Sequence, residues 1–241
     1  MVMIKRAKRH NILVSITSTS NPIGWVEKVK KISELGIEEA ALFPTTLKQN
    51  QRKELYSTLE KSTIRSIPHV HLRGDMEDWE LDLFIVKYNT RFFNIHPDKS
   101  KHPFGRDFSK YREKIYVENV LVVPEQKELK KCAGLCIDFS HWEANVLYGN
   151  GEYNEKMRKM SDKFPIGCCH VSAVRNRSEY NPKFPDKFSG KLGQHFMESL
   201  NDLDYIKKYK KYLPEFVSIE LENSIAEQLE AKKYLEKMIN N

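Results

Sequence analysis

Histidines and carboxylates stand at the ends of successive apolar runs in this chain, and their types suit the binding of a transition metal. The apolar run Leu135–Phe139 contains Asp138 near its end, and His141 follows three residues after that acid. A carboxylate at the end of a buried strand carries a large desolvation penalty unless a metal, a cation or a hydrogen-bond donor meets it. A simpler interpretation, in which Asp138 caps the next helix and His141 is solvated, also fits this stretch.

The same pattern recurs along the chain, and the recurrence favours a metal site. Polar residues of this kind lie at the ends of six successive predicted strands: His69 and His71, His96, Glu118, Asp138, His170 and Glu220. Buried acids in this number would repel one another without a cation. A mixture of imidazole and carboxylate suits Zn, Mn, Fe or Co better than Ca, which prefers oxygen ligands alone. We therefore expect one or two divalent metal ions as cofactors.

The elements that must position these residues alternate between short β-rich runs and amphipathic helical runs. Helical spacing or capping signals follow most of the predicted strands, over residues 21–36, 48–61, 77–88, 125–131, 152–163 and from Ser224 onward. The predicted strands are Ile12–Thr17, Glu39–Phe43, Arg65–Leu72, Arg91–His96, Lys114–Val120, Leu135–Phe139, Ile166–Ser172 and Phe216–Leu221. Eight strands alternating with helices in 241 residues predict an α/β fold, a single (β/α)8 TIM barrel over residues 1–241. In such a barrel the carboxyl ends of the strands meet at one mouth, so the polar residues would converge.

Composition narrows the class of protein. The chain is 40% hydrophobic and 30% charged, with a formal net charge of +7, which permits an anionic substrate or nucleic acid. The cysteines lack the paired spacing of a structural zinc site, and we expect buried thiols in a reducing cytoplasm: Cys132, Cys136, Cys168 and Cys169. No apolar stretch is long enough to span a membrane, and no phosphate-binding glycine loop occurs. The segment Ala173–Leu192 is rich in Asn, Arg, Pro and Lys, and we expect it to lack regular structure.

The ordered motifs resemble those of the xylose-isomerase-like TIM-barrel superfamily. The motifs are His-Pro at 96–97, Glu-Asn at 118–119, Asp-x-x-His at 138–141, His170 and Ser-Ile-Glu at 218–220. The resemblance covers nearly the whole chain, and its specificity lies in the order and strand position of short motifs. The superfamily includes sugar and sugar-phosphate isomerases and epimerases as well as the endonuclease IV type of abasic-site nuclease.

The epimerase branch of the superfamily implies one metal ion held by Glu118, Asp138, His170 and Glu220. Glu118 and Glu220 would also be the catalytic residues, exchanging a proton at the carbon between them on opposite sides of the substrate. All four residues are present. This branch implies a small-molecule sugar or sugar phosphate as substrate, and it is the function that we expect first.

The endonuclease IV branch implies further zinc ligands at His69, His96 and His141, together with an Asp-x-His pair at positions 193 and 195. Gly193 stands where that Asp would be, although His195 is present. Strand periodicity aims His69 and His71 at the same face, so either could be the ligand of strand three. This alternative is a two-metal hydrolase with Glu118 as the bridge, acting on abasic DNA. A third alternative is a barrel that keeps metal but is not catalytic.

Three further residues are candidates for substrate binding. Trp142 could stack on a sugar ring, Arg175 could bind a phosphate, and Asn119 directly follows Glu118. Trp142 could instead simply pack at the end of its strand. Arg175 could instead only keep a long loop soluble.

Overall fold

A sheet of parallel strands forms the centre of the computed structural model, which describes residues 10–103, 106–175 and 193–240. Its nine strands are ordered β1-β11-β8-β7-β6-β5-β4-β3-β2, and every neighbouring pair is parallel. The strands are β1 (Asn11–Leu13), β2 (Ser15–Thr17), β3 (Ala41–Phe43), β4 (His69–His71), β5 (Phe92–Ile95), β6 (Ile115–Glu118), β7 (Gly134–Asp138), β8 (Ile166–Val171) and β11 (Phe216–Ile219). Each overlaps one of the predicted strands, and β1 and β7 begin one residue before the predicted start.

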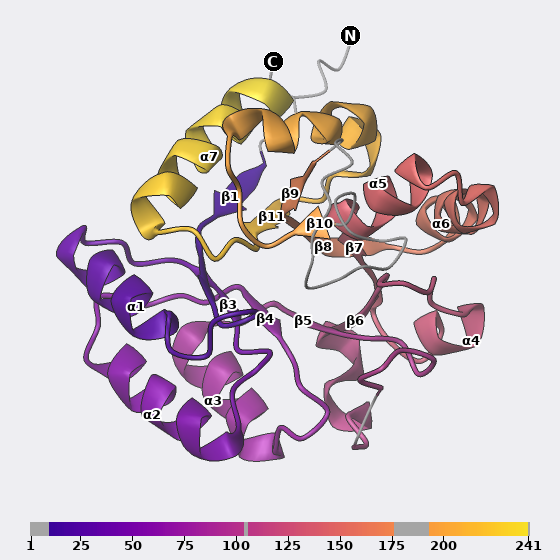
Figure 1. Cartoon of the computed structure of the whole chain (residues 1–241). Coiled ribbons are helices and arrows are strands. Elements are labelled where there is room, and N and C mark those ends of the chain that lie inside the picture. The colour runs from indigo at the N-terminus through magenta and orange to yellow at the C-terminus, as the bar shows by residue number, and fades with distance from the viewer. Residues whose placement is uncertain (1–9, 104–105, 176–192, 241) are drawn as a thin grey trace, which may run out of the picture.

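The sheet curls into a nearly closed barrel because its two edges belong to one stretch of chain. β1 pairs with β11 at one edge and β2 pairs with β3 at the other, and only Val14 separates β1 from β2. The predicted strand Ile12–Thr17 is therefore one barrel strand in two halves, and the nine strands make eight positions. The predicted TIM-barrel fold is confirmed. Figure 1 shows β1, at the start of the chain, beside β11 near its end.

A buried glutamine joins the two edges at the point where the chain passes from β1, paired with β11, to β2, paired with β3. Gln228 lies on α7 (Ile225–Ile239); its Oε1 accepts from the Ser15 amide at 2.8 Å, and its Nε2 donates to the carbonyls of Ser15 (3.2 Å), Leu221 (3.0 Å) and Asn223 (3.1 Å). The hydroxyl of Thr17 also donates to the carbonyl of Leu221 at 2.9 Å. Side chains thus satisfy backbone groups that the sheet leaves unpaired at this seam.

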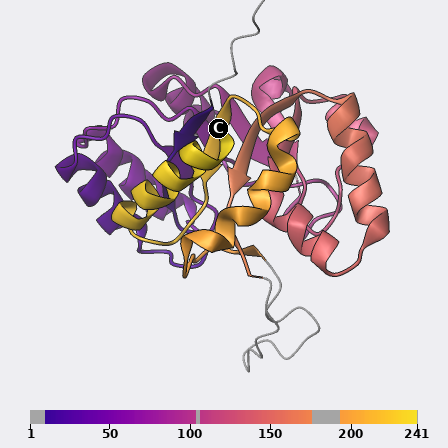
Figure 2. The ribbon, with the colours of Figure 1, turned by 90° about the horizontal axis from the view of Figure 1, so that it is seen from above.

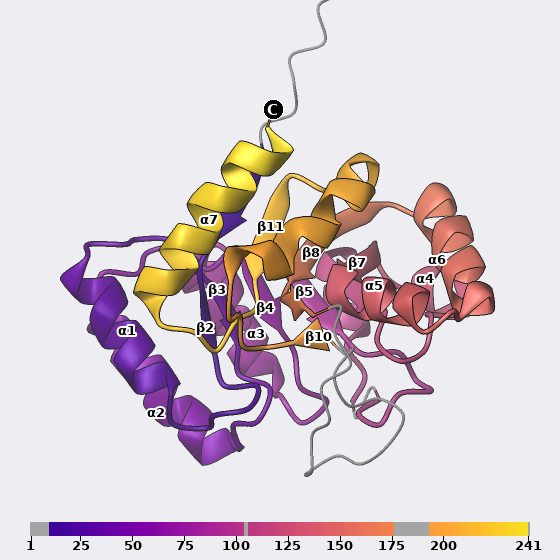
Figure 3. The ribbon, with the colours of Figure 1, turned by 45° about the horizontal axis from the view of Figure 1, so that its top comes forward.

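Helices surround the strands (Figures 1 and 3). The other helices are α1 (Trp25–Glu34), α2 (Gln49–Glu60), α3 (Asp78–Tyr88), α4 (Gln126–Leu129), α5 (Phe139–Leu147), α6 (Gly151–Lys163) and the 3₁₀ segments η1 (Ser109–Lys114) and η2 (Leu200–Tyr212). Figure 2 shows α7 and η2, in yellow and orange, lying side by side against the barrel. Among the described helices, none has both the length and the apolar character needed to cross a bilayer.

Two local features differ from the sequence prediction. The apolar run after Gly134 ends as a strand at Asp138, and α5 begins immediately at Phe139, whereas we expected the next helix near residue 152. The cause is the Asp138 side chain, which accepts the amide of His141 and starts the helix. The segment expected to lack regular structure begins with β9 (Ala173–Val174), which pairs antiparallel with β10 (Gly193–Gln194). Residues 176–192 lie outside the described residues.

The apolar core lies mostly between the sheet and the helices, with a smaller cluster inside the barrel. That inner cluster includes Leu13, Ala41, Phe43, Phe92, Cys136, Cys168 and Phe216. The rings of Phe92 and Phe216 lie 5.3 Å apart, and Tyr116 packs against Phe92 at 5.7 Å. Phe43 lies at the end of β3 and contacts histidine rings that come from β4 and β8. The cluster therefore fills the barrel beneath the polar residues at the carboxyl ends of the strands.

We expect Gln228→Leu to lower the free energy of unfolding by at least about 2 kcal/mol, because the amide of Ser15 and the carbonyls it contacts would stay buried without partners. Denaturant unfolding measures the effect. Lys233→Leu, an exposed position on the same helix, is the control for adding an apolar side chain to α7. Equal stability of the two variants would show that Gln228 does not hold the seam.

Candidate metal centre

Glu118, the last residue of β6, lies at the centre of a buried polar group in the barrel mouth. Its side chain is 3% exposed. The Oε2 atom lies 3.2 Å from Nε2 of His71 and 3.2 Å from Nε2 of His170, and Oε1 lies 3.8 Å from Nε2 of His96. Burial alone would raise the pKa of Glu118, but the imidazoles of His170 and His96 outweigh it and hold that pKa well below its usual value. The carboxylate is therefore ionised.

His71, His96 and Glu118 form the first of two groups with metal-ligand spacing. Their ligand atoms all lie within 4.8 Å of one another. Nδ1 of His71 donates to the backbone carbonyl of Leu72 at 2.8 Å, so in the neutral ring Nε2 has a lone pair directed at Glu118 and at His96. Burial lowers the pKa of His96 to about 4, which keeps this ring neutral at pH 7. Metal-binding histidines typically donate their other nitrogen to such a carbonyl, so His71 is arranged as a ligand.

Glu118, Asp138 and His170 form the second group, within the same 4.8 Å limit. His170, on β8, lies among three carboxylates: Nε2 faces Glu118, and Nδ1 lies 2.8 Å from Glu220 and 3.5 Å from Asp138. Neither ring nitrogen makes a hydrogen bond of acceptable geometry with them. Burial alone would lower the pKa of His170, but the three carboxylates outweigh it and raise that pKa. A divalent cation would satisfy the same negative charge, so the donor set fits a metal.

Asp138 both caps α5 and faces this group, so the two interpretations of it are compatible. Its Oδ1 accepts from the hydroxyl of Ser140 at 2.6 Å and from the amide of His141 at 2.9 Å. Its Oδ2 remains directed at His170. The start of the helix thus fixes the carboxylate in one orientation.

Glu220, directly after β11, completes the ring of carboxylates. Thr19 donates to its Oε1 at 3.1 Å, and Nδ1 of His195 lies 3.8 Å from the same atom. Burial would raise the pKa of Glu220, but His195 and His170 lower it to about 2. The barrel mouth therefore holds two glutamates on opposite nitrogens of His170.

His141 and His195 lie at the rim of the mouth. Nε2 of His141 is 3.7 Å from Oδ2 of Asp138, and the side chains of His141 and His195 are 26% and 29% exposed. Nδ1 of each ring is buried without a hydrogen-bond partner. Among the described residues these two histidines are not members of a group with mutual ligand spacing. They are placed to contact whatever lies above the metal ligands.

His69 does not join the site, and the structure brings His71 there instead. His69 is fully buried; its Nδ1 lies 2.8 Å from the hydroxyl of Ser218 and its Nε2 lies 2.9 Å from Oδ1 of Asn94. Period-2 geometry points both histidines inward, but His69 sits one layer deeper, beside Cys136 and Cys168. Both of its nitrogens are engaged by other partners.

The residues predicted to bind substrate have structural partners. Asn119 is fully buried and pairs with the backbone of Asp138 through both amide atoms, at 2.9 Å each. Trp142 is 1% exposed, is stacked on Phe139 and is covered by Tyr209 and Tyr212 of η2, so it has no free face for a sugar ring. Arg175 is paired with Glu198 at 2.7 Å. The structure thus places Trp142 in a packing role, and Asn119 and Arg175 in pairing roles.

Asn94 and Thr19 contact the site but were not among the predicted residues. Asn94 donates to Oε2 of Glu118, and Thr19 donates to Glu220. A signal for Asn94 existed in the sequence: it lies two residues before His96 within an apolar run, and so on the same strand face. Thr19 lies in a loop, where no periodicity marks it.

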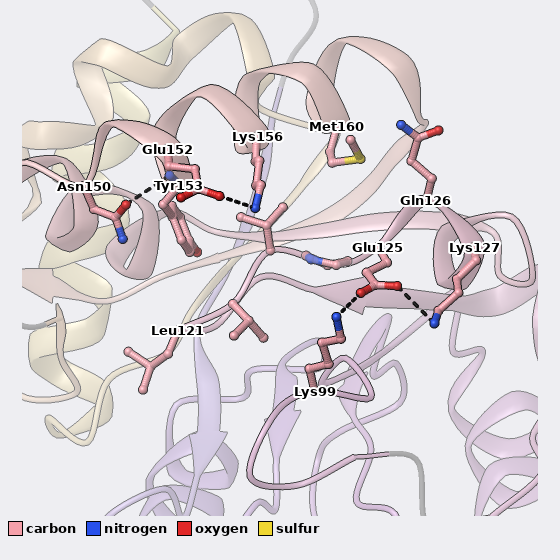
Figure 4. A pocket seen from close by; sticks show the side chains of 13 residues that line it. Lys99, Leu121, Glu125, Gln126, Lys127, Asn150, Glu152, Tyr153, Lys156 and Met160 are labelled. Atoms are coloured by element: carbon pink, nitrogen blue, oxygen red, sulfur yellow. Dashed lines mark hydrogen bonds and ion pairs between the residues drawn. The ribbon is translucent and has the colours of Figure 1, made fainter.

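A separate pocket of about 630 Å³ lies on the flank of the barrel, between the chain after β6 and helix α6 (Figure 4). Its floor is apolar, with Leu121 and Met160 among its lining residues. The lysines at its edge are already paired: Lys127 lies 3.1 Å from Glu125, and Lys156 lies 2.6 Å from Glu152. This pocket holds none of the groups with metal-ligand spacing described above.

Comparisons with known proteins found likenesses in structure alone. No protein-family model and no curated protein matches the chain. The crystal structure of a xylose isomerase domain containing protein from Salmonella typhimurium LT2 is similar over 97% of this chain and 95% of that one, with 12% sequence identity and a TM-score of 0.41. A likeness of this degree carries no functional inference. The barrel itself is established by the strand pairing described above.

We expect His96→Ala to lower the number of bound divalent ions while the barrel stays folded, because His96 is a ligand candidate of the first group and only part of that group would remain. Elemental analysis of protein purified without chelator measures the stoichiometry, and circular dichroism reports the fold. His102→Ala is the control, because His102 is exposed and its ring lies 6.1 Å from that of His96. An unchanged metal content together with a large loss of stability would make His96 a structural histidine.

Proposed function

We propose that this protein is a divalent-metal-dependent phosphoester hydrolase whose two metal-ligand groups share Glu118. The observation that carries the proposal is the group of His71, His96 and Glu118 beside that of Glu118, Asp138 and His170. A carboxylate common to two such groups is the arrangement of a two-metal site. A one-metal isomerase would leave His71 and His96 without a role.

The donor atoms indicate which ions would bind. Imidazole nitrogen and carboxylate oxygen occur together in both groups, which favours Zn, Mn, Fe or Co over Mg or Ca. His71 and His96 with Glu118 would hold one ion, and Glu118, Asp138 and His170 with Glu220 beside them would hold the other. Bound divalent ions supply Lewis-acid polarisation of a phosphoryl oxygen and activation of water.

The protein's own residues prepare the site for this chemistry. The N-terminus of α5 orients Asp138, and the imidazoles around Glu118 keep it ionised. Phe43 closes the floor, with its ring 5.5 Å from that of His170, and so excludes water from below the ligands. At the rim, the rings of His141 and His195 are 26% and 29% exposed, so each can contact a phosphate group bound above the ligands. The net charge of +7 favours the approach of an anion.

A sugar or sugar-phosphate isomerase or epimerase is the second candidate, and one observation favours it. Glu118 and Glu220 face opposite ring nitrogens of His170, at 3.2 and 2.8 Å, so two carboxylates from different strands flank one position. Such a pair can remove a proton from one side of a carbon and return it from the other. Both candidates require the second ligand group, and only the hydrolase requires the first.

We expect the metal-loaded protein to cleave phosphoesters and Glu118→Gln to lower turnover by at least about 100-fold, because loss of even an outer partner of a metal ligand costs about 10–100-fold. Phosphate release is measured on sugar phosphates, on phosphodiesters and on DNA with an abasic site. Glu215→Gln, an exposed acid paired with Arg91 away from the mouth, is the matched control and should keep full activity. Binding of fewer than two ions per chain would contradict the proposal.

For the isomerase, the expected result is deuterium incorporation from solvent at the carbon next to a ketose carbonyl. Glu118→Gln and Glu220→Gln should each lower that exchange by about 10²–10⁴-fold, the usual worth of general acid–base catalysis. Mass spectrometry of a panel of sugars and sugar phosphates measures it. Exchange without phosphoester cleavage would replace the hydrolase by the isomerase, and cleavage without exchange would remove the isomerase.

A further inference from the structure

A continuous line of polar side chains crosses the interior of the barrel beneath the metal centre. It runs from Ser218 on β11 through His69 on β4 and Asn94 on β5 to Glu118 on β6. These residues are 0% to 2% exposed. Interior positions of a TIM barrel are usually filled by branched apolar side chains. Four hydrogen-bonding residues in contact there therefore indicate a functional role.

The direction of the hydrogen bonds in this line follows from the Asn94 amide. Its nitrogen, which can only donate, faces Oε2 of Glu118, and its oxygen faces Nε2 of His69. That oxygen only accepts, so His69 carries its proton on Nε2. Nδ1 of His69 is then an acceptor, and the hydroxyl of Ser218 donates to it. The contacts therefore allow a single tautomer of His69 and a single orientation of Asn94.

The same contacts decide between two roles for His69. One of its nitrogens lies within 4.8 Å of the thiols of Cys136 and Cys168, a spacing that could hold a metal ion. A ligand, however, needs a free lone pair, and both nitrogens of His69 are engaged, at 2.8 and 2.9 Å. Burial also raises the pKa of the Cys136 thiol, which disfavours the thiolate that a metal would require. His69 is thus arranged as a donor to Asn94.

We propose that Asn94 and His69 are positioning residues for Glu118: His69 orients the Asn94 amide, which holds one carboxylate oxygen so that the carboxylate faces both ligand groups. Without the Asn94 donor, Oε2 would keep only the imidazoles of His71 and His170 as neighbours, and the side chain could turn away from His96. Outer partners of this kind set the orientation and affinity of metal ligands. This inference rests on the proposed function insofar as Glu118 holds metal.

The test combines cobalt binding with the tautomer of His69. Titration of the full chain with Co²⁺ should give a dissociation constant about 10–100-fold higher for Asn94→Leu than for wild type. His69→Leu should weaken binding in the same direction, and His69→Gln should restore it, because the Gln amide can still donate to Asn94. Thr90→Val, which removes a buried hydrogen bond at the opposite end of the same strand segment, is the control and should leave affinity unchanged.

Two further readouts separate positioning from a general loss of stability. In the double variant His69→Leu with Asn94→Leu, affinity should equal that of Asn94→Leu alone, since His69 acts through Asn94; additive losses would overturn the proposal. In metal-free wild type, ¹⁵N NMR should show the His69 proton on Nε2, and a proton on Nδ1 would also overturn it. A cobalt–thiolate absorption band would place His69 with the cysteines as ligands and reject the assignment. If wild type binds no cobalt, the proposed function is refuted. The His69 tautomer would still test whether His69 donates to Asn94.

Discussion

Three carboxylates buried around one imidazole are the interaction on which the barrel mouth depends. Glu118, Asp138 and Glu220 all approach His170, and each is less than 5% exposed. Charges of one sign at this density are stable in a protein interior only beside positive charge, either a protonated imidazole or a metal ion. Burial keeps the ring of His96 neutral, and Nε2 of His71 and Nε2 of His96 lie 3.2 and 3.8 Å from Glu118, an arrangement that favours the metal.

The closed parallel sheet allows three carboxylates to lie this close together. Parallel strands direct all their carboxyl ends to one side, and closure brings strands that are distant in sequence within reach of a common centre. The barrel closes through one interrupted strand, whose halves β1 and β2 pair with β11 and β3. At the break between the halves, the Gln228 amide satisfies the backbone of Ser15. The apolar rings beneath, from Phe43 to Phe216, keep water from entering the barrel below the site.

The polar line from Ser218 to Glu118 links the interior to the mouth. Orienting the Glu118 carboxylate therefore constrains buried residues on three other strands, β5, β4 and β11. The same principle operates at Asp138, whose free oxygen faces His170 because its other oxygen caps α5. In both places a hydrogen bond to the carboxylate fixes the direction in which it faces the site.

The succession of strands, and which of them end in His or carboxylate, could be predicted from the sequence, because strand periodicity and the polar residues that end each apolar run are local properties. The sequence could not separate His69 from His71, since a period of two places both inside the barrel and only the tertiary contacts with Asn94 and Ser218 set their depth. Nor could the sequence predict that η2 covers Trp142, or that the Asn119 side chain hydrogen-bonds the backbone of Asp138. Those outcomes depend on contacts between residues far apart in the chain, which only the folded structure brings together.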